Sequence, residues 1–184
     1  MSVRSYAKIN WSLRITGKRS DGFHDLETVF QTISLHDTLT FRESDRLTLT
    51  CDDPSIPTDE TNLVLRAAHA VGAPPVAIEI AKRIPAGGGL GGGSSNAAAT
   101  LRALGGDRSD LAEIALSLGS DVPFFLVGGT CYATGRGEVL TPMPPMPAIP
   151  LLLVLPEERV MTKDAFARIT RYSQPLGINA YGDF

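Results

Sequence analysis

The chain has 184 residues, of which 43% are hydrophobic and 20% charged, and its formal net charge is −3. These values are typical of a globular protein with one large or two small domains. They offer no general attraction for nucleic acid or an anionic membrane, and no apolar run approaches the ~20 residues of a spanning helix. The N-terminus lacks the pattern of a signal peptide, and Cys51 and Cys131 show neither metal nor disulfide spacing. We therefore expect a cytoplasmic protein.

The chain alternates between predicted strands and helices. From Ile9 to Ile15 apolar and polar residues alternate, which predicts a strand with Lys8 and Asn10 on one face. Similar patterns predict the elements that follow. Further strands are expected at Thr28–Leu35, Leu47–Cys51, Val76–Ala81 and Thr130–Thr134, and helices at Glu60–Val71, capped by Thr58 or Asp59, at Asn96–Leu104 and at Asp110–Leu118.

A boundary is expected between Pro142 and Pro150, where five prolines exclude both helix interior and sheet. Beyond it, the apolar run Leu151–Leu155 predicts a buried strand, and Thr162–Tyr172 predicts a helix. The final stretch, Ser173–Phe184, has no strong period.

The most distinctive stretch lies between Ile84 and Ala99, where six glycines surround Leu90 and lead into two serines and an alanine-rich run. Glycine allows positive φ and close approach of a ligand, and the alanine run favours a helix with Ser94 or Ser95 as its N-cap. A glycine loop at a helix N-terminus is a ready anion site, most often for phosphate. The alternative is a flexible linker, but such linkers do not run straight into a strong helix.

Other phosphate-binding motifs fit this stretch less well. A P-loop requires a lysine at the helix start, and here no lysine follows the glycines. A protein-kinase loop requires later His-Arg-Asp and Asp-Phe-Gly triplets, and neither occurs. A dinucleotide fingerprint stays an alternative, because a predicted strand precedes the loop and Asp110 or Glu113 follows at a suitable distance.

Three further residues are candidates for chemistry. Lys8 lies on a polar strand face, Asp121 stands between a helix end and an apolar run, and His24 follows a turn and Phe23. Each also has an ordinary structural explanation: a solvated lysine, a capping aspartate, and a loop with a packed phenylalanine. None of the three is specific alone.

In combination these features match a known family, in family order from Ala7 to about Phe166. The matching motifs are Ala7-Lys8-Ile9-Asn10, Ile15-Thr16-Gly17, Asp21-Gly22-Phe23-His24, Thr61-Asn62-Leu63, Lys82-Arg83-Ile84-Pro85, the glycine loop, Gly119-Ser120-Asp121-Val122-Pro123 and Gly135-Arg136-Gly137-Glu138. The chain resembles the GHMP kinase superfamily of galactokinase, homoserine kinase, mevalonate kinase and phosphomevalonate kinase. Within it, the chain is most similar to the branch that phosphorylates a hydroxyl of 4-diphosphocytidyl-2-C-methyl-D-erythritol in the non-mevalonate isoprenoid pathway.

The resemblance implies an α+β fold with two domains. Residues 1–148 would form a ribosomal-protein-like, nucleotide-binding domain, and residues 149–184 would begin a ferredoxin-like substrate domain. Members normally continue for roughly another hundred residues, about one further domain. A nucleotide-binding module without turnover is therefore one alternative, and a homoserine or mevalonate type of kinase is another.

The resemblance also implies ATP-dependent transfer to a small molecule that carries a cytidine diphosphate group. Asp121 would take the hydroxyl proton, and Lys8 would orient it and offset developing charge. Magnesium is expected with the nucleotide; its ligands stay open, with Ser94 and Ser95 as candidates. Gly91→Val is expected to weaken ATP binding more than the fold.

The remaining site residues divide between nucleotide and substrate. The ATP side would comprise Asn62, Lys82, Pro85, Ala86, Gly87, Gly88, Gly89, Leu90, Gly91, Gly92, Gly93, Ser94 and Ser95. The substrate side would comprise Asn10, Phe23, His24, Thr162 and Phe166, with the two phenylalanines stacking on cytosine. Phe23 stands where the family often has tyrosine.

Overall fold

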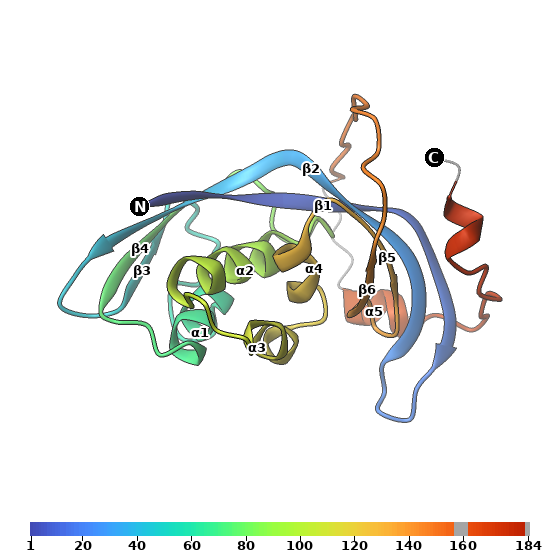
Figure 1. Ribbon diagram of the computed structural model, residues 1–184, viewed down its shortest axis with the longest axis horizontal. Helices are drawn as coiled ribbons and strands as arrows, with labels where there is room; N and C mark the ends of the chain where they lie inside the picture. The colour runs from blue at the N-terminus through green and yellow to red at the C-terminus, as the bar shows by residue number, and fades with distance from the viewer. Residues whose placement is uncertain (157–161, 183–184) are drawn as a thin grey trace.

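A computed structural model of the chain describes residues 1–156 and 162–182. Within them, a six-stranded sheet carries α1, α2, α3 and α4 on one face (Figure 1). The strands are β1 (Ser2–Lys18), β2 (His24–Glu43), β3 (Thr48–Cys51), β4 (Val76–Ala81), β5 (Thr130–Thr134) and β6 (Val139–Pro142). The helices are α1 (Leu63–Ala70), α2 (Gly92–Leu104), α3 (Leu111–Leu118), α4 (Val122–Val127), α5 (Thr162–Ala167) and the 3-10 turn η1 (Ile178–Tyr181).

The long strand β2 organises the sheet. β1 runs antiparallel along one edge of it, while β4 and β5 share the other edge at opposite ends. β5 pairs only as far as Gln31, and β4 pairs only from Thr38. Between them, the carboxylate of Asp37 accepts hydrogen bonds from the backbone N–H groups of Arg83 and Ile84, at 2.7 and 2.8 Å. The Asp37 side chain therefore provides hydrogen bonds to the backbone at the point where the chain leaves β4 for the glycine loop and no longer pairs with β2.

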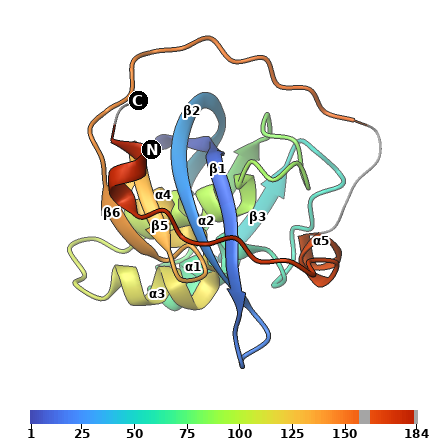
Figure 2. The same ribbon diagram turned by 90° about the vertical axis from the view of Figure 1, so that its right-hand side faces the viewer.

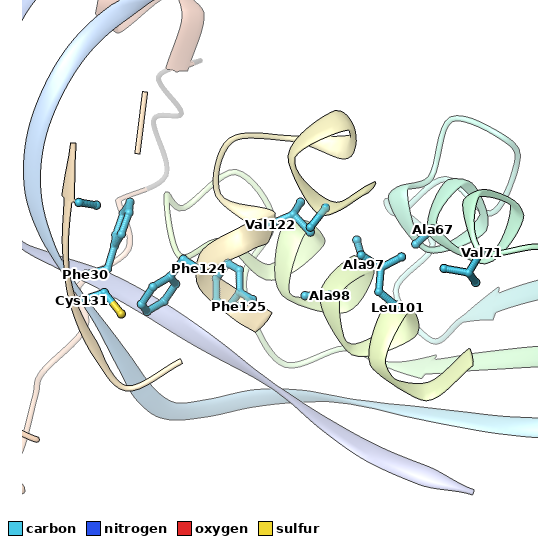
Figure 3. Close-up of a cluster of buried hydrophobic side chains, with 12 residues drawn as sticks. Phe30, Ala67, Val71, Ala97, Ala98, Leu101, Val122, Phe124, Phe125 and Cys131 are labelled. Atoms are coloured by element: carbon cyan, nitrogen blue, oxygen red, sulfur yellow. The ribbon is translucent and has the colours of Figure 1, made fainter. Parts of the chain in front are cut away.

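The main hydrophobic core lies between the sheet and the helices (Figure 3). Phe30 from β2 packs on Phe124 from α4, with ring centroids 4.9 Å apart. On α2, buried alanines such as Ala97 let the helix approach its neighbours closely. Each phenylalanine buried in this way stabilises the fold by about 1.5–3 kcal/mol. The core thus fixes α2 and α4, whose N-termini face the site described below.

Most predicted elements are confirmed, but the two predicted helix caps are wrong. Asp59 accepts from the backbone N–H of Thr61 in a turn, and the N-cap of α1 is Asn62, whose Oδ1 accepts from Val64 N at 2.9 Å. α2 begins at Gly92 with Gly91 as its N-cap. Ser94 and Ser95 lie inside its first turn, because glycine at positive φ starts this helix without a side-chain cap.

The chain after β6 also departs from prediction. Leu151–Leu155 forms no strand and is exposed, with Leu152 at 89%. An apolar run becomes a strand only beside a partner for its backbone, and none of the described strand pairs includes this run. Figure 2 shows the stretch after β6 as an arc on the side away from α1 and α3. α5 ends at Ala167, before the predicted Tyr172, whereas β6, α4 and η1 were not predicted.

The strand from Ile9 to Ile15 is confirmed within β1, but its apolar face is not uniformly buried. Leu13 is half exposed. A register shift against β2 between Asn10 and Ser12 breaks the strict alternation that the sequence shows. The longest described helix, α2, has 13 residues, and none of the helices in the described ranges could cross a membrane.

Candidate functional site

The glycine loop forms one wall of a cavity of about 300 Å³, a volume at the lower end of small-molecule sites. Gly87, Gly89 and Gly91 have φ of +74°, +71° and +72°, so the expected positive-φ backbone is confirmed. The cavity is lined by Ile56, Pro57, Thr61, Asn62, Leu63, Ile80, Lys82, the loop from Pro85 to Gly93, and Asn96. All but two of the residues expected on the ATP side line it; Ser94 and Ser95 lie just beyond, in the first turn of α2.

The N-terminus of α2 opens at this cavity. The first hydrogen bond of the helix runs from Ser95 N to Gly91 O at 2.8 Å, so the N–H groups of Gly92, Gly93 and Ser94 precede the intrahelical ladder. Free N–H groups and the positive end of the helix dipole both favour an anion at this point. The geometry is therefore that of a phosphate-binding loop.

The loop is held tightly against the core at Gly91. Lys8 N donates to Leu90 O at 3.0 Å, which joins the loop to β1. A Cβ on Gly91 would lie 2.5 Å from Phe125 Cζ and 3.2 Å from Lys8 Cγ. Because Phe125 is buried, any side chain at this position disturbs the core as well as the cavity. Gly91→Val is therefore expected to cost stability as well as ATP binding, and which of the two losses is larger stays a prediction.

A buried carboxylate supports the far wall of the cavity. Asp37 is 0% exposed, and Lys82 Nζ lies 3.0 Å from its Oδ2. Asn96 Nδ2 donates to the same oxygen at 3.0 Å, and Lys82 Nζ also donates to Ile84 O. Lys82 therefore reaches the cavity with its charge already balanced, and Asp37 fixes β2, the start of the loop and α2 relative to one another.

Sequence reasoning missed both Asp37 and Asn96. A signal existed for Asp37, since an acidic residue stands inside an otherwise strand-like run. For Asn96, the amide orientation follows from its partner: its Nδ2 must face the carboxylate of Asp37. Its Oδ1 is then an acceptor, and this buried atom has no hydrogen-bond partner in the described part of the chain.

The second feature of the site is the pair Lys8 and Asp121. The structure places Lys8 Nζ 3.6 Å from Asp121 Oδ2, 2.8 Å from Asn10 Oδ1 and 5.0 Å from the ring centre of Phe30. Asp121 directly precedes α4 but makes no side-chain cap hydrogen bond to it. Its carboxylate is thus available, partly exposed, beside a buried ammonium group. The predicted common face of Lys8 and Asn10 is confirmed by their direct hydrogen bond.

A short polar chain extends from this pair along the sheet. Asn10 Nδ2 donates to Thr28 Oγ1 at 2.7 Å, and Thr28 in turn donates to the carbonyl of Ser12. Both β1 and β2 therefore fix the amide of Asn10, with its Oδ1 toward Lys8. This arrangement sets the position of the Lys8 ammonium.

Three residues expected on the substrate side, Phe23, His24 and Phe166, lie near the start of β2, whereas Asn10 lies beside Lys8. The rings of His24 and Phe166 lie 5.4 Å apart, and Tyr172 lies 6.3 Å from His24. Phe23 is about half exposed, and the guanidinium of Arg136 lies 4.5 Å from its ring centre. Thr162 is the first residue of α5, but its side chain lies outside the described part. The structure thus brings Phe166 onto His24, with Phe23 against Arg136.

The described residues contain no group of three or more His, Cys, Asp or Glu side chains that could hold a metal ion. Of the two serines considered as magnesium ligands, Ser95 fits poorly. Its hydroxyl is buried, donates to Tyr6 O at 2.6 Å and accepts from Ser5 Oγ at 2.7 Å. Ser94 offers a hydroxyl oxygen in the first turn of α2, and Asp121 offers a carboxylate. Oxygen donors of this kind suit magnesium bound together with phosphates.

A larger cavity of about 1050 Å³ lies elsewhere, between the strand segment 31–38 and residues 146–153. Trp11, Ile33, Leu35 and Ile149 contribute to its lining, together with Arg83. It has neither a helix N-terminus nor the glycine loop. We therefore assign the candidate site to the smaller cavity.

The sequence matches the family model described as GHMP kinases N terminal domain over residues 62–129. It is 46% identical over 178 residues to a 4-diphosphocytidyl-2-C-methyl-D-erythritol kinase of Chlorobium phaeobacteroides, covering 90% of this chain and 62% of that protein. For the kinase of the same name from Chlorobium limicola, identity is 43% over 192 residues, covering 96% and 67%. The chain thus spans 62–67% of the length of these two curated relatives.

Solved structures show the same likeness. A crystal structure of 4-(cytidine 5'-diphospho)-2C-methyl-D-erythritol kinase matches with a TM-score of 0.65 and 41% identity, over 78% of this chain and 56% of that one. The mevalonate kinase of Methanococcus jannaschii matches with a TM-score of 0.58 and 16% identity, over the same shares. The second likeness concerns the fold alone.

Proposed function

The chain belongs to the 4-diphosphocytidyl-2-C-methyl-D-erythritol kinase family of GHMP kinases, and from this premise we propose that the protein transfers the γ-phosphoryl group of ATP to a hydroxyl of that substrate. The reaction would serve the non-mevalonate isoprenoid pathway in the cytoplasm. The net charge of −3 supports small-molecule ligands rather than nucleic acid or a membrane as partners.

One observation carries the proposal: an anion-binding loop lies directly beside a lysine–aspartate pair. The Cβ position of Gly91 is 3.2 Å from Lys8 Cγ, and Lys8 Nζ is 3.6 Å from Asp121. Phosphoryl transfer depends mainly on positioning and charge stabilisation, so a phosphate cradle must adjoin the groups that handle the acceptor hydroxyl. This juxtaposition supports a kinase better than a passive nucleotide-binding module.

In the proposed mechanism, the N–H groups of the loop and of α2 hold the triphosphate. The acceptor hydroxyl oxygen forms a bond to the γ-phosphorus as the bond to the β–γ bridging oxygen breaks, and ADP leaves. Asp121 takes the hydroxyl proton, and Lys8, fixed by Asn10, orients Asp121 and offsets charge at the transferred group. Magnesium bound with ATP would supply charge neutralisation, with the Ser94 hydroxyl as the oxygen ligand at hand.

We assign the nucleotide to Asn62, Lys82 and the residues from Pro85 to Ser95. We assign the cytidine diphosphate substrate to Asn10, Phe23, His24, Thr162 and Phe166. Residues 1–148 would form the nucleotide-binding domain, and residues 149–184 would begin the substrate domain. The prolines between Pro142 and Pro150 support that division.

The test is a phosphotransfer assay with ATP, magnesium and one of three acceptors: 4-diphosphocytidyl-2-C-methyl-D-erythritol, homoserine or mevalonate. Products would be identified by mass spectrometry. We expect transfer to the cytidine-containing acceptor alone. Transfer to homoserine or mevalonate would replace the proposed substrate, and ATP binding without transfer to any acceptor would leave a nucleotide-binding module.

A further inference from the structure

Glu27, on β2, is a buried carboxylate that the mechanism does not use. It is 1% exposed, yet it accepts hydrogen bonds from four donors. Its oxygens lie 3.0 Å from Leu176 N, 2.9 Å from Gly177 N, 2.9 Å from the Tyr132 hydroxyl and 2.8 Å from the Tyr181 hydroxyl. An acidic side chain this deeply buried is ordinarily retained only where its charge is fully partnered, as it is here.

Three of the four donors belong to the closing segment, which we define as residues 173–182. The segment makes two further contacts with β1: Ser173 N donates to Ile15 O at 2.8 Å, and Arg14 Nε donates to Gln174 O at 3.1 Å. The rings of Tyr132 and Tyr181 lie 5.9 Å apart. Figure 2 shows the segment crossing β1 and β2 on its way from α5 to η1. Glu27 is therefore the main polar anchor of this segment on the sheet.

The same stretch of chain carries the aromatic residues of the substrate side. Tyr172 directly precedes the closing segment, and Phe166 lies in α5 just before it. Both rings lie near His24, which is three residues before Glu27 on the same strand. The segment thus links two points of β2: the aromatic group at His24 and the carboxylate at Glu27.

We propose that Glu27 is a positioning residue, whose ionised carboxylate fixes the closing segment across β1 and β2 and thereby keeps Phe166 and Tyr172 against His24. In this role Glu27 acts on the substrate through the closing segment and makes no contact with the substrate itself. The effect on substrate rests on the proposed function, in which His24 and Phe166 contact the cytidine group. The docking of the segment does not depend on that assignment.

The electrostatics of the contact favour the charged form. Burial alone would raise the pKa of Glu27, but the N–H groups of Gly177 and Leu176 and the hydroxyls of Tyr181 and Tyr132 outweigh it, so the pKa is lowered. Burial and the neighbouring Glu27 raise the pKa of Tyr132 to about 12, so its hydroxyl stays a donor. A lowered pKa means that docking is favoured above the usual pKa of a glutamate and is lost as the pH falls through the lowered value. The other ionisable groups near the Glu27 carboxylate are Tyr181, which donates to it, and Arg14, which lies opposite Glu27 in the pairing of β1 with β2.

Glu27→Gln tests the proposal, because an amide keeps the shape but turns one acceptor into a donor facing other donors. Hydrogen exchange followed by mass spectrometry would report on docking, and calorimetric titration with cytidine diphosphate and with ATP would report on the site. We expect about ten-fold faster exchange across residues 174–182, about ten-fold weaker binding of cytidine diphosphate, and unchanged ATP binding. Glu43→Gln, an exposed carboxylate at the end of the same strand, is the matched control and should change none of these.

Tyr181→Phe gives a milder test should Glu27→Gln disturb the fold, since it removes one donor and keeps the ring. It should move exchange and cytidine diphosphate binding in the same direction by a smaller factor. Unchanged exchange in Glu27→Gln would overturn the docking role. Faster exchange with unaltered cytidine diphosphate binding would overturn the positioning role. Absence of cytidine diphosphate binding by the unsubstituted protein would overturn the substrate assignment and with it the positioning role, while the exchange result would still decide the docking.

Discussion

The proposed nucleotide side and the proposed substrate side of this site differ in how they are held. On the nucleotide side, the glycine loop lies between β4 and α2, both packed in the core, and Asp37 ties the wall together. On the substrate side, His24 meets Phe166 because a segment far along the chain crosses the sheet and is fixed at Glu27. Lys8 lies beside the glycine loop at Gly91 and pairs with Asp121.

This difference has a consequence for mutagenesis. Substitutions in the core contacts that hold the glycine loop should lower both the free energy of unfolding and the affinity for ATP, because the same contacts provide both. Changes on the substrate side should alter recognition while leaving the free energy of unfolding nearly unchanged, because few core residues take part.

Asp121→Asn should reduce turnover by about 10²–10⁴-fold and leave ATP affinity nearly unchanged, because it removes a general base while keeping its shape. Single-turnover phosphotransfer and nucleotide titration would measure the two quantities. Asp107→Asn, an exposed aspartate after α2, is the control. Turnover that stays at the level of this control would remove Asp121 from the mechanism.

Asp37→Asn should lower the free energy of unfolding by about 3–5 kcal/mol, because Lys82 would keep a buried charge without its partner. Denaturant titration measures this, with the exposed Asp45→Asn as control. The double variant Asp37→Asn/Lys82→Met should lose less than the sum of the two single losses. Additive losses would show that the two side chains act independently.

Two glycines of the loop allow the strain of a positive φ to be measured with and without a steric clash against the core. Gly91→Ala should destabilise by more than Gly89→Ala, although both glycines have φ near +70°. A Cβ at Gly89 meets nothing within 4 Å, so only the strain of about 1–2 kcal/mol applies, whereas Gly91 adds a clash with Phe125. Equal shifts of the denaturation midpoint would contradict the contact with Phe125.

Phe23→Ala should weaken cytidine diphosphate binding by roughly ten-fold, since stacking of a base on an aromatic ring is worth about 1–3 kcal/mol in single-strand binders. ATP affinity and thermal stability should barely change. Leu13→Ala removes a similarly exposed apolar side chain from β1 and serves as control. Equal effects of the two variants would indicate that Phe23 does not stack on the base.

Local features of the site were easier to predict from the sequence than contacts between distant residues, for a physical reason. The glycine loop and the common face of Lys8 and Asn10 are local patterns, which short-range geometry determines. Asp37 was missed because its partners, Lys82 and Asn96, follow 45 and 59 residues later. Glu27 was missed for the same reason, since its partners lie as far away as Tyr181. Leu151–Leu155 failed as a strand because hydrophobicity does not provide a pairing partner.

The proposed site is tested most directly by locating the nucleotide on the protein. Hydrogen exchange of the 184-residue chain would be compared with and without a non-hydrolysable ATP analogue. We expect slower exchange across residues 86–95, around the glycine loop and the start of α2, with residues 31–38 and 174–182 unchanged. Protection of residues 31–38, which line the larger cavity, together with an unchanged glycine loop would contradict it.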